Sequence, residues 1–105
     1  MYCRDKKMTY IYIMYNSLND LYKIGRSDNP YQREKQLKGV VPEIQLLDYV
    51  LDYPDSEKIW HDRFKDERKF GEWFRLDKFQ VSNVLALFKR QKYVLSLVSE
   101  GLIHA

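Results

Sequence analysis

TYIYIMYNSLNDLYKIGR, residues 9–26, is the stretch that decides the fold. Its first part, residues 9–15, alternates along its length and is rich in β-branched and aromatic residues, which favours a strand. Residues 16–20 form a polar turn, and residues 21–26 return as a second strand. The stretch therefore predicts an antiparallel hairpin.

The alternation of the hairpin also predicts which side chains share a face. Ile11 and Ile13 lie on one face of the first strand, and Lys23 and Gly25 share a face of the second. When the isoleucines of both strands point into one core, Tyr12 and Lys23 come together on the opposite side of the sheet.

A short helix is predicted directly after the hairpin. Asn29 followed by Pro30, with Gln32 at the third helical position, is a helix-start pattern, and Gly39 is a plausible stop. The pattern places Arg33 in the first turns of this helix.

The next two elements are a strand and a second helix. Residues 44–53 are apolar and β-favouring, which indicates a third strand. After Pro54 a helix is expected to run to about Lys69, carrying His61 beside its apolar face.

The last third of the chain contains a short aromatic segment and a longer helix. Residues 70–76 include Glu72, and Asp77 with Gln80 three residues later predicts the start of a third helix. Residues 93–103 are weakly patterned, so the helix either continues through them or folds back as a second short one.

These elements predict an α/β (α+β) fold with a small, mainly antiparallel three-stranded sheet flanked by helices. The 105 residues, 45% of them hydrophobic, suffice for one modest core, so residues 1–105 are expected to form a single domain. Its core covers about residues 9–76, and its C-terminal helical part covers about residues 77–105.

The composition also indicates where the protein resides and whether it contains a disulfide or a structural zinc ion. No apolar run is long enough to span a membrane, and the first residues do not resemble a signal peptide, so a soluble, intracellular (cytoplasmic) protein is expected. Cys3 is the only cysteine and the two histidines are scattered, which predicts neither an internal disulfide nor a structural zinc site.

The net charge of +3 is distributed in blocks of opposite sign. Residues 23–38 hold five Lys/Arg against two Asp/Glu, residues 63–92 hold nine against four, and residues 39–62 hold one against six. If the two basic sections meet in space, they form a groove that attracts a polyanion. The alternative is that they are solvated helix faces, and the sequence leaves both readings open.

Several separated segments resemble the GIY-YIG nuclease superfamily. Residues 10–12, Tyr-Ile-Tyr, stand where the superfamily has Gly-Ile-Tyr, and residues 23–25, Lys-Ile-Gly, stand where it has Tyr-Ile-Gly. The small branch found in phage and bacterial open reading frames looks closest, since that branch typically reads Tyr-Lys-Ile-Gly, as residues 22–25 do. Its members also tend to carry an Arg, a His and a Gly-Glu-Trp/Tyr-Phe segment, which match Arg33, His61 and residues 71–74.

The resemblance covers about residues 9–76 and implies a GIY-YIG-like fold that hydrolyses a DNA phosphodiester with one divalent cation, Mg²⁺ or Mn²⁺. Glu72 would hold the cation, because a hard cation that keeps most of its waters needs few carboxylates. Tyr12 would orient or deprotonate the attacking water, with Lys23 easing its ionisation. Arg33 would reach the scissile phosphate through its planar donor fork.

The resemblance also leaves alternatives open. Arg26 is a candidate for a second phosphate contact, and His61 is a weaker candidate for a proton shuttle, because such a histidine is more often a half-buried structural residue. Since Lys23 replaces a tyrosine, the base is Tyr12, Tyr22 or a water. Tyr12 is favoured because Tyr22 should face away from Lys23.

Two other functions compete with the nuclease. One is a nucleic-acid-binding module on the same fold without catalysis, and the other is a protein-interaction domain with a Tyr/Trp-rich surface. A protein partner that supplies specificity is also compatible with so short a chain.

Overall fold

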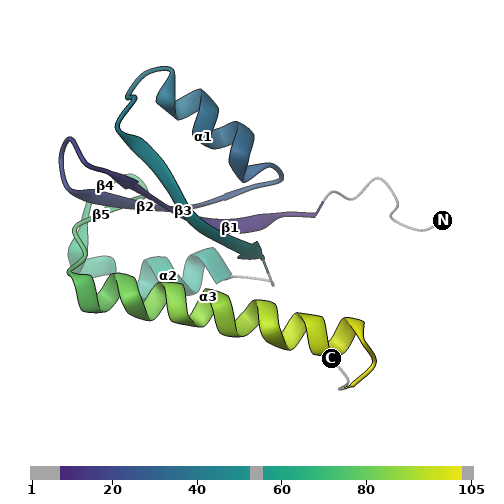
Figure 1. The fold of residues 1–105 in the computed structure, drawn as a ribbon. Helices are drawn as coiled ribbons and strands as arrows, with labels where there is room; N and C mark the ends of the chain where they lie inside the picture. Colours follow the sequence, from purple (N-terminus) through teal and green to yellow (C-terminus); the bar gives the residue numbers. More distant parts are fainter. Residues whose placement is uncertain (1–7, 53–55, 103–105) are drawn as a thin grey trace.

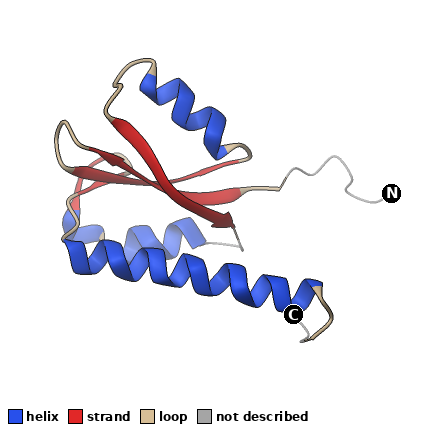
Figure 2. Ribbon diagram, in the orientation of Figure 1, coloured by secondary structure: helices blue, strands red, loops and turns tan. Residues whose placement is uncertain are grey.

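One β-sheet with helices on both faces makes up the fold (Figure 1). The computed structural model describes residues 8–52 and 56–102. α1 covers one face of the sheet, and α2 and α3 cover the other (Figure 2). In chain order the elements are β1 (Tyr10–Asn16), β2 (Leu21–Ser27), α1 (Pro30–Lys38), β3 (Ile44–Leu51), α2 (Ser56–Arg63), a 3₁₀ helix (Lys65–Glu67), β4 (Arg68–Phe70), β5 (Trp73–Phe74) and α3 (Lys78–Ser99).

The α+β class is confirmed, but the prediction of three strands is wrong. Within the described residues the sheet has five strands in the order β3-β1-β2-β5-β4, and each neighbouring pair is antiparallel. The two additional strands form a second hairpin, in which β5 pairs with β2 through Trp73 opposite Lys23 and Phe74 opposite Tyr22. Gly71 makes the turn with a φ of +51°, a conformation that glycine adopts without strain.

The second hairpin also explains why α2 is shorter than predicted. The helix ends at Arg63 rather than near Lys69, and the chain is already extended at Arg68, with φ −66° and ψ 132°. All five residues from 65 to 69 are charged and suit a helix locally, but pairing of β4 with β5 outweighs this weak preference. The predicted start after Pro54 falls outside the described residues.

The first hairpin has the predicted pairing and the predicted faces. Tyr12 lies opposite Gly25, and Ile13 lies opposite Ile24. Tyr12 and Met14 belong to a smaller core beneath α1. The larger core lies between the sheet and the other two helices and contains Ile11, Ile13, Ile24, Val50, Trp60, Phe64, Phe74, Leu76, Val81, Val84 and Phe88.

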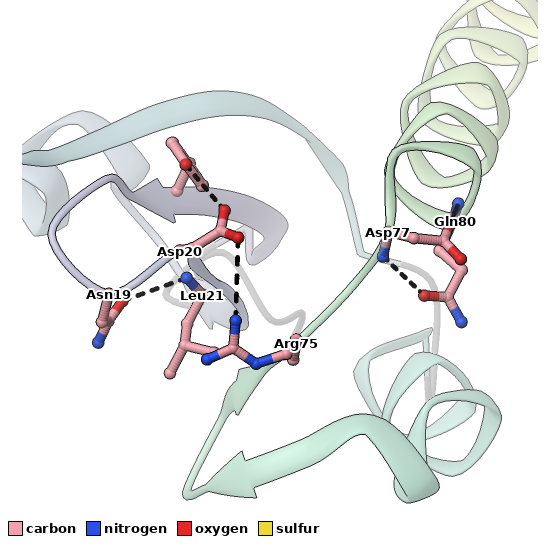
Figure 3. Close-up of polar contacts among 7 residues, drawn as sticks. Asn19, Asp20, Leu21, Arg75, Asp77 and Gln80 are labelled. Carbon is pink, nitrogen blue, oxygen red and sulfur yellow. Dashed lines mark hydrogen bonds and ion pairs between the residues drawn. The ribbon is translucent and has the colours of Figure 1, made fainter.

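The two helix starts predicted from capping patterns are confirmed. The Asn29 side chain accepts a hydrogen bond from the backbone N–H of Gln32, and Pro30 occupies the first turn of α1. At α3, Asp77 and Gln80 cap each other reciprocally, and Figure 3 shows one of these bonds. α3 is continuous to Ser99, so the weakly patterned residues 93–99 extend the helix.

The turn between β1 and β2 is held by local side-chain bonds (Figure 3). Asp20 has a φ of +59°, and its carboxylate accepts a bond from the Tyr15 hydroxyl and faces Arg75 at 3.8 Å. The Asn19 side chain accepts from the N–H of Leu21. These contacts fix the register that places Tyr12 opposite Gly25.

Helices rich in basic residues lie in different layers of the fold. α1 carries Arg33, Lys35 and Lys38, whereas α3 lies on the opposite face of the sheet (Figure 1). The cations of these two helices therefore do not line one shared groove. Within the described ranges, no helix combines the length and the apolar content needed to cross a bilayer.

Candidate active site

Gly25 marks the point where the side chains of two candidate site residues meet. A Cβ built on Gly25 would lie 2.6 Å from the Tyr12 hydroxyl and 2.8 Å from Oε1 of Glu72. Both oxygens therefore lie within 2.8 Å of one point above β2. Only a glycine leaves this space open, which gives the last residue of the Lys-Ile-Gly segment a physical role.

The Glu72 carboxylate lies above Gly25 because the second hairpin pairs with β2. The backbone N–H of Ile24 donates to the carbonyl of Glu72 at 3.1 Å, just beyond the pairs formed by Trp73 and Phe74. The ammonium of Lys23 lies 2.9 Å from Oε1 of Glu72. The strand pairing and this ion pair together hold the carboxylate above Gly25.

Tyr12 is buried, with 1% of its surface exposed. Burial raises the pKa of Tyr12 to about 12, with a further increase from the negative charge of Glu72, while the Arg33 guanidinium lowers it. Arg33 is thus the cation that acts on this phenol. Lys23, which the sequence suggested for that role, is paired with Glu72 instead.

Arg33 belongs to the same neighbourhood but is exposed to solvent. It lies on α1, the helix that covers the Tyr12 face of the sheet (Figure 1). Its side chain helps to line a depression of about 260 Å³ together with residues of the β2–α1 connection. A large anion could therefore reach the guanidinium from solvent.

Glu57 is a member of the site that the sequence reading missed. Burial raises the pKa of this carboxyl, and the charge of Glu72 and a hydrogen bond to Glu72 raise it further, while His61 and Arg26 lower it. Two carboxyl groups from distant segments therefore lie side by side. The available signal was the spacing, because Glu57 precedes His61 by four residues and so shares its face of α2.

His61 and Arg26 are engaged next to the site rather than at its centre. Nε2 of His61 lies 2.7 Å from the carbonyl of Ile24, so this nitrogen carries a proton and donates it. Nε of Arg26 lies 2.8 Å from the buried carboxylate of Asp52. By strand alternation Arg26 is on the face of β2 opposite Lys23 and Gly25.

Tyr22 lies on the other side of the sheet from the cluster. It packs against the larger core and its ring centroid is 4.7 Å from that of Tyr15. The prediction that Tyr22 faces away from Lys23 is confirmed, which leaves Tyr12 as the tyrosine beside Glu72.

Comparison with protein families matches residues 9–89 to the T5orf172 domain. The chain belongs to the T5orf172 domain family. This domain is associated with nucleases, so a nuclease or another nucleic-acid-related role agrees with the cluster around Gly25. Neither the curated proteins nor the solved structures yield a match.

Gly25→Ala should destabilise this T5orf172 domain at the candidate active site. The new methyl group would collide with the Tyr12 hydroxyl and with Glu72, and the Tyr12 ring is too enclosed to move freely. We expect a loss of about 1–3 kcal/mol in the free energy of unfolding, measured by urea titration. Gly39→Ala is the control, because its φ of −62° suits alanine and its Cβ would approach the Gln36 carbonyl no closer than 3.2 Å. An equal loss in both variants would contradict the crowding at Gly25.

Proposed function

We propose that the chain is a metal-dependent DNA endonuclease of the GIY-YIG type. The observation that carries this proposal is the convergence of the Tyr12 hydroxyl and the Glu72 carboxylate above Gly25, with Arg33 close enough to act on the phenol. A water-orienting hydroxyl, a cation-binding acid and a phosphate-binding guanidinium are the groups that hydrolysis of a phosphodiester requires.

Membership of the T5orf172 family supports a nuclease. The assignment to the GIY-YIG type rests on two sequence segments and their positions. The Tyr-Ile-Tyr and Tyr-Lys-Ile-Gly segments at residues 10–12 and 22–25 occupy adjacent strands. The hydroxyl of the first segment faces the glycine of the second, as a shared site would require. These positions support the proposal that the chain is a member of the small phage and bacterial branch of the superfamily.

Glu57 and Glu72 fit a divalent cation. The charge of Glu72 disfavours the ionised form of Glu57, and a cation between the two carboxyl groups would relieve that repulsion. No group of three or more His, Cys, Asp or Glu side chains suited to a metal occurs in residues 8–52 and 56–102. Mg²⁺ commonly needs only one or two carboxylates plus the phosphate of its substrate. Bound there, Mg²⁺ or Mn²⁺ would stabilise charge on the leaving oxygen.

The remaining groups have roles that follow from their contacts. Lys23 holds the Glu72 carboxylate over Gly25, and Arg33 offers two parallel N–H donors to oxygens of the scissile phosphate. A pKa of about 12 keeps the Tyr12 phenol protonated at neutral pH. That favours a hydroxyl that orients the attacking water over one that takes its proton.

The proposal is tested by incubating the purified chain with supercoiled plasmid DNA in Mg²⁺, in Mn²⁺ and in EDTA. We expect nicked and linear products with either metal and unchanged plasmid in EDTA. Binding of DNA without any cutting in all three conditions would favour the inactive DNA-binding module. Absence of both binding and cutting would favour the protein-interaction domain.

Glu57→Gln should weaken the metal site. Replacing one carboxylate by an amide removes a charge and an anionic oxygen donor, so we expect Mn²⁺ affinity to fall roughly tenfold or more. The measurement is the free Mn²⁺ signal in electron paramagnetic resonance titrations of protein with Mn²⁺. Glu43→Gln is the matched control, since Glu43 is an exposed glutamate before β3. Equal affinity in both variants would exclude Glu57 as a ligand.

A further inference from the structure

Three tyrosines from three different elements form a cluster at the surface. The ring of Tyr49 on β3 contacts Tyr10 on β1 at a centroid distance of 5.5 Å and Tyr31 on α1 at 5.3 Å. Both pairs are edge-to-face, at 89° and 80°. Tyr31 remains 62% exposed, so its ring is packed on one side and open to solvent on the other. We call these three residues the tyrosine platform.

The tyrosine platform is connected to the candidate active site by adjoining hollows. Tyr10, Tyr31 and Tyr49 line the first hollow, of about 390 Å³. A second hollow shares Tyr10 with the first and adds Asn29 and Gln32. The depression that contains Arg33 shares Asn29 and Gln32 with the second. A continuous surface track therefore runs from the platform around the beginning of α1 to Arg33.

Tyr31 and Arg33 are close enough for one short segment of an extended polymer to contact both. Tyr31 and Arg33 are two residues apart, which is ~3 Å along the helix axis and ~200° around it. They therefore lie on opposite sides of a helix about 10 Å across. One extended chain that passes the beginning of α1 could contact both residues.

The chemistry of the track favours nucleic-acid bases over the phosphate backbone. The amide side chains of Asn29 and Gln32 lie in its walls beside Tyr10, and Lys92 is paired with Asp48. Aromatic faces and amide side chains are the groups that stack on and hydrogen-bond to unpaired bases. A duplex would keep its bases stacked inside and present phosphates to this surface.

We propose that the tyrosine platform stacks unpaired bases of a DNA strand whose phosphate is held at Arg33. This inference rests on the proposed nuclease function and deepens it. It gives the substrate class as DNA with a single-stranded segment next to the cleavage point. Base stacking on aromatic side chains tolerates any sequence, because every base has a π face.

The test is a binding measurement in EDTA, which excludes cutting. Fluorescence anisotropy is recorded with a labelled 15-nucleotide oligo(dT) and with a labelled duplex of the same length. Tyr31→Ala should weaken binding of the single strand roughly 5- to 100-fold and the duplex far less. Tyr31→Phe keeps the ring and should bind within about twofold of the unmodified protein, and the slope of log Kd against log salt should stay unchanged in both variants.

Three outcomes would overturn the stacking proposal. They are unchanged binding by Tyr31→Ala, equal losses in Tyr31→Ala and Tyr31→Phe, and equal losses for single strand and duplex. These results are separable from a failure of the nuclease, because no cutting is measured. A further result is possible, in which Tyr31→Ala loses single-strand binding, Tyr31→Phe keeps it, and the unmodified protein never cuts DNA. That result would support the tyrosine platform and contradict the proposed nuclease function.

Discussion

Glu72→Gln is expected to abolish Mg²⁺-dependent nicking of plasmid DNA, with an initial rate at least about 1,000-fold lower than that of the unmodified chain. The amide has nearly the same shape as the carboxylate but carries no charge, so it cannot hold a divalent cation above Gly25. The loss should appear at every Mg²⁺ concentration, because the site would lack a central anionic ligand.

The fold should survive Glu72→Gln. The side chain of Glu72 is 39% exposed, and its ion pair with Lys23 contributes about 0–1 kcal/mol in such a setting. Attachment of the β4–β5 hairpin to β2 depends on the backbone of residue 72, which the substitution leaves in place. Urea unfolding of Glu72→Gln and of the control Glu43→Gln measures this point. Nicking at the unmodified rate by Glu72→Gln, with the fold intact, would remove Glu72 from the mechanism.

Arg33→Ala should lower the single-turnover rate of cutting about 100- to 1,000-fold while changing the Kd for DNA less than about tenfold. The guanidinium matches the oxygens of the phosphate most closely when charge accumulates on them in the transition state, so the rate depends on it more than binding does. Arg33→Lys should restore binding but little of the rate, because an ammonium lacks the planar donor fork.

Lys38→Ala is the matched control for Arg33→Ala, since it removes one positive charge from the same helix. Lys38 contacts only Glu34, at 3.9 Å and one turn back, among the ion pairs of the described residues. Its removal should change the rate less than about threefold. Equal rate losses in Arg33→Ala and Lys38→Ala would show that α1 acts through its overall charge and not through a contact of Arg33 with the phosphate.

The first hairpin and the helix starts could be predicted because their signals are local. Alternation in residues 10–16 and 21–27 divides the side chains of each strand between two faces. Pointing the isoleucines of both strands into one core then places Tyr12 and Lys23 together on the opposite face. Asn29 and Asp77 mark the starts of their helices, because their side chains cap the first backbone N–H groups.

The second hairpin could not be predicted in the same way. Its strands are three and two residues long, too short to show a period, and the charged residues before them resemble a helix. β5 is a strand because it pairs with β2, which lies about fifty residues earlier in the chain, and β4 is a strand because it pairs with β5. Glu72 could be chosen from its motif, but its position above Gly25 depends on that distant pairing.

The individual roles of charged residues were the least predictable part of the site. A sequence does not show that Lys23 pairs with Glu72, that Arg26 pairs with Asp52 or that Glu57 lies against Glu72. Each of these contacts joins residues that are well separated along the chain. Charged side chains are also long and flexible, so residue type alone does not fix their partners.

The most direct test of the account is an order-of-addition experiment with single-turnover amounts of supercoiled plasmid. The unmodified chain is first mixed with DNA in EDTA, and excess Mg²⁺ is added after several minutes of sampling. Cation-assisted hydrolysis at Glu72 predicts that all of the plasmid stays supercoiled until Mg²⁺ arrives and that nicked circles then accumulate. Nicking before the addition, or a plasmid that is bound yet remains supercoiled long after it, would contradict a cation-assisted hydrolysis at Glu72.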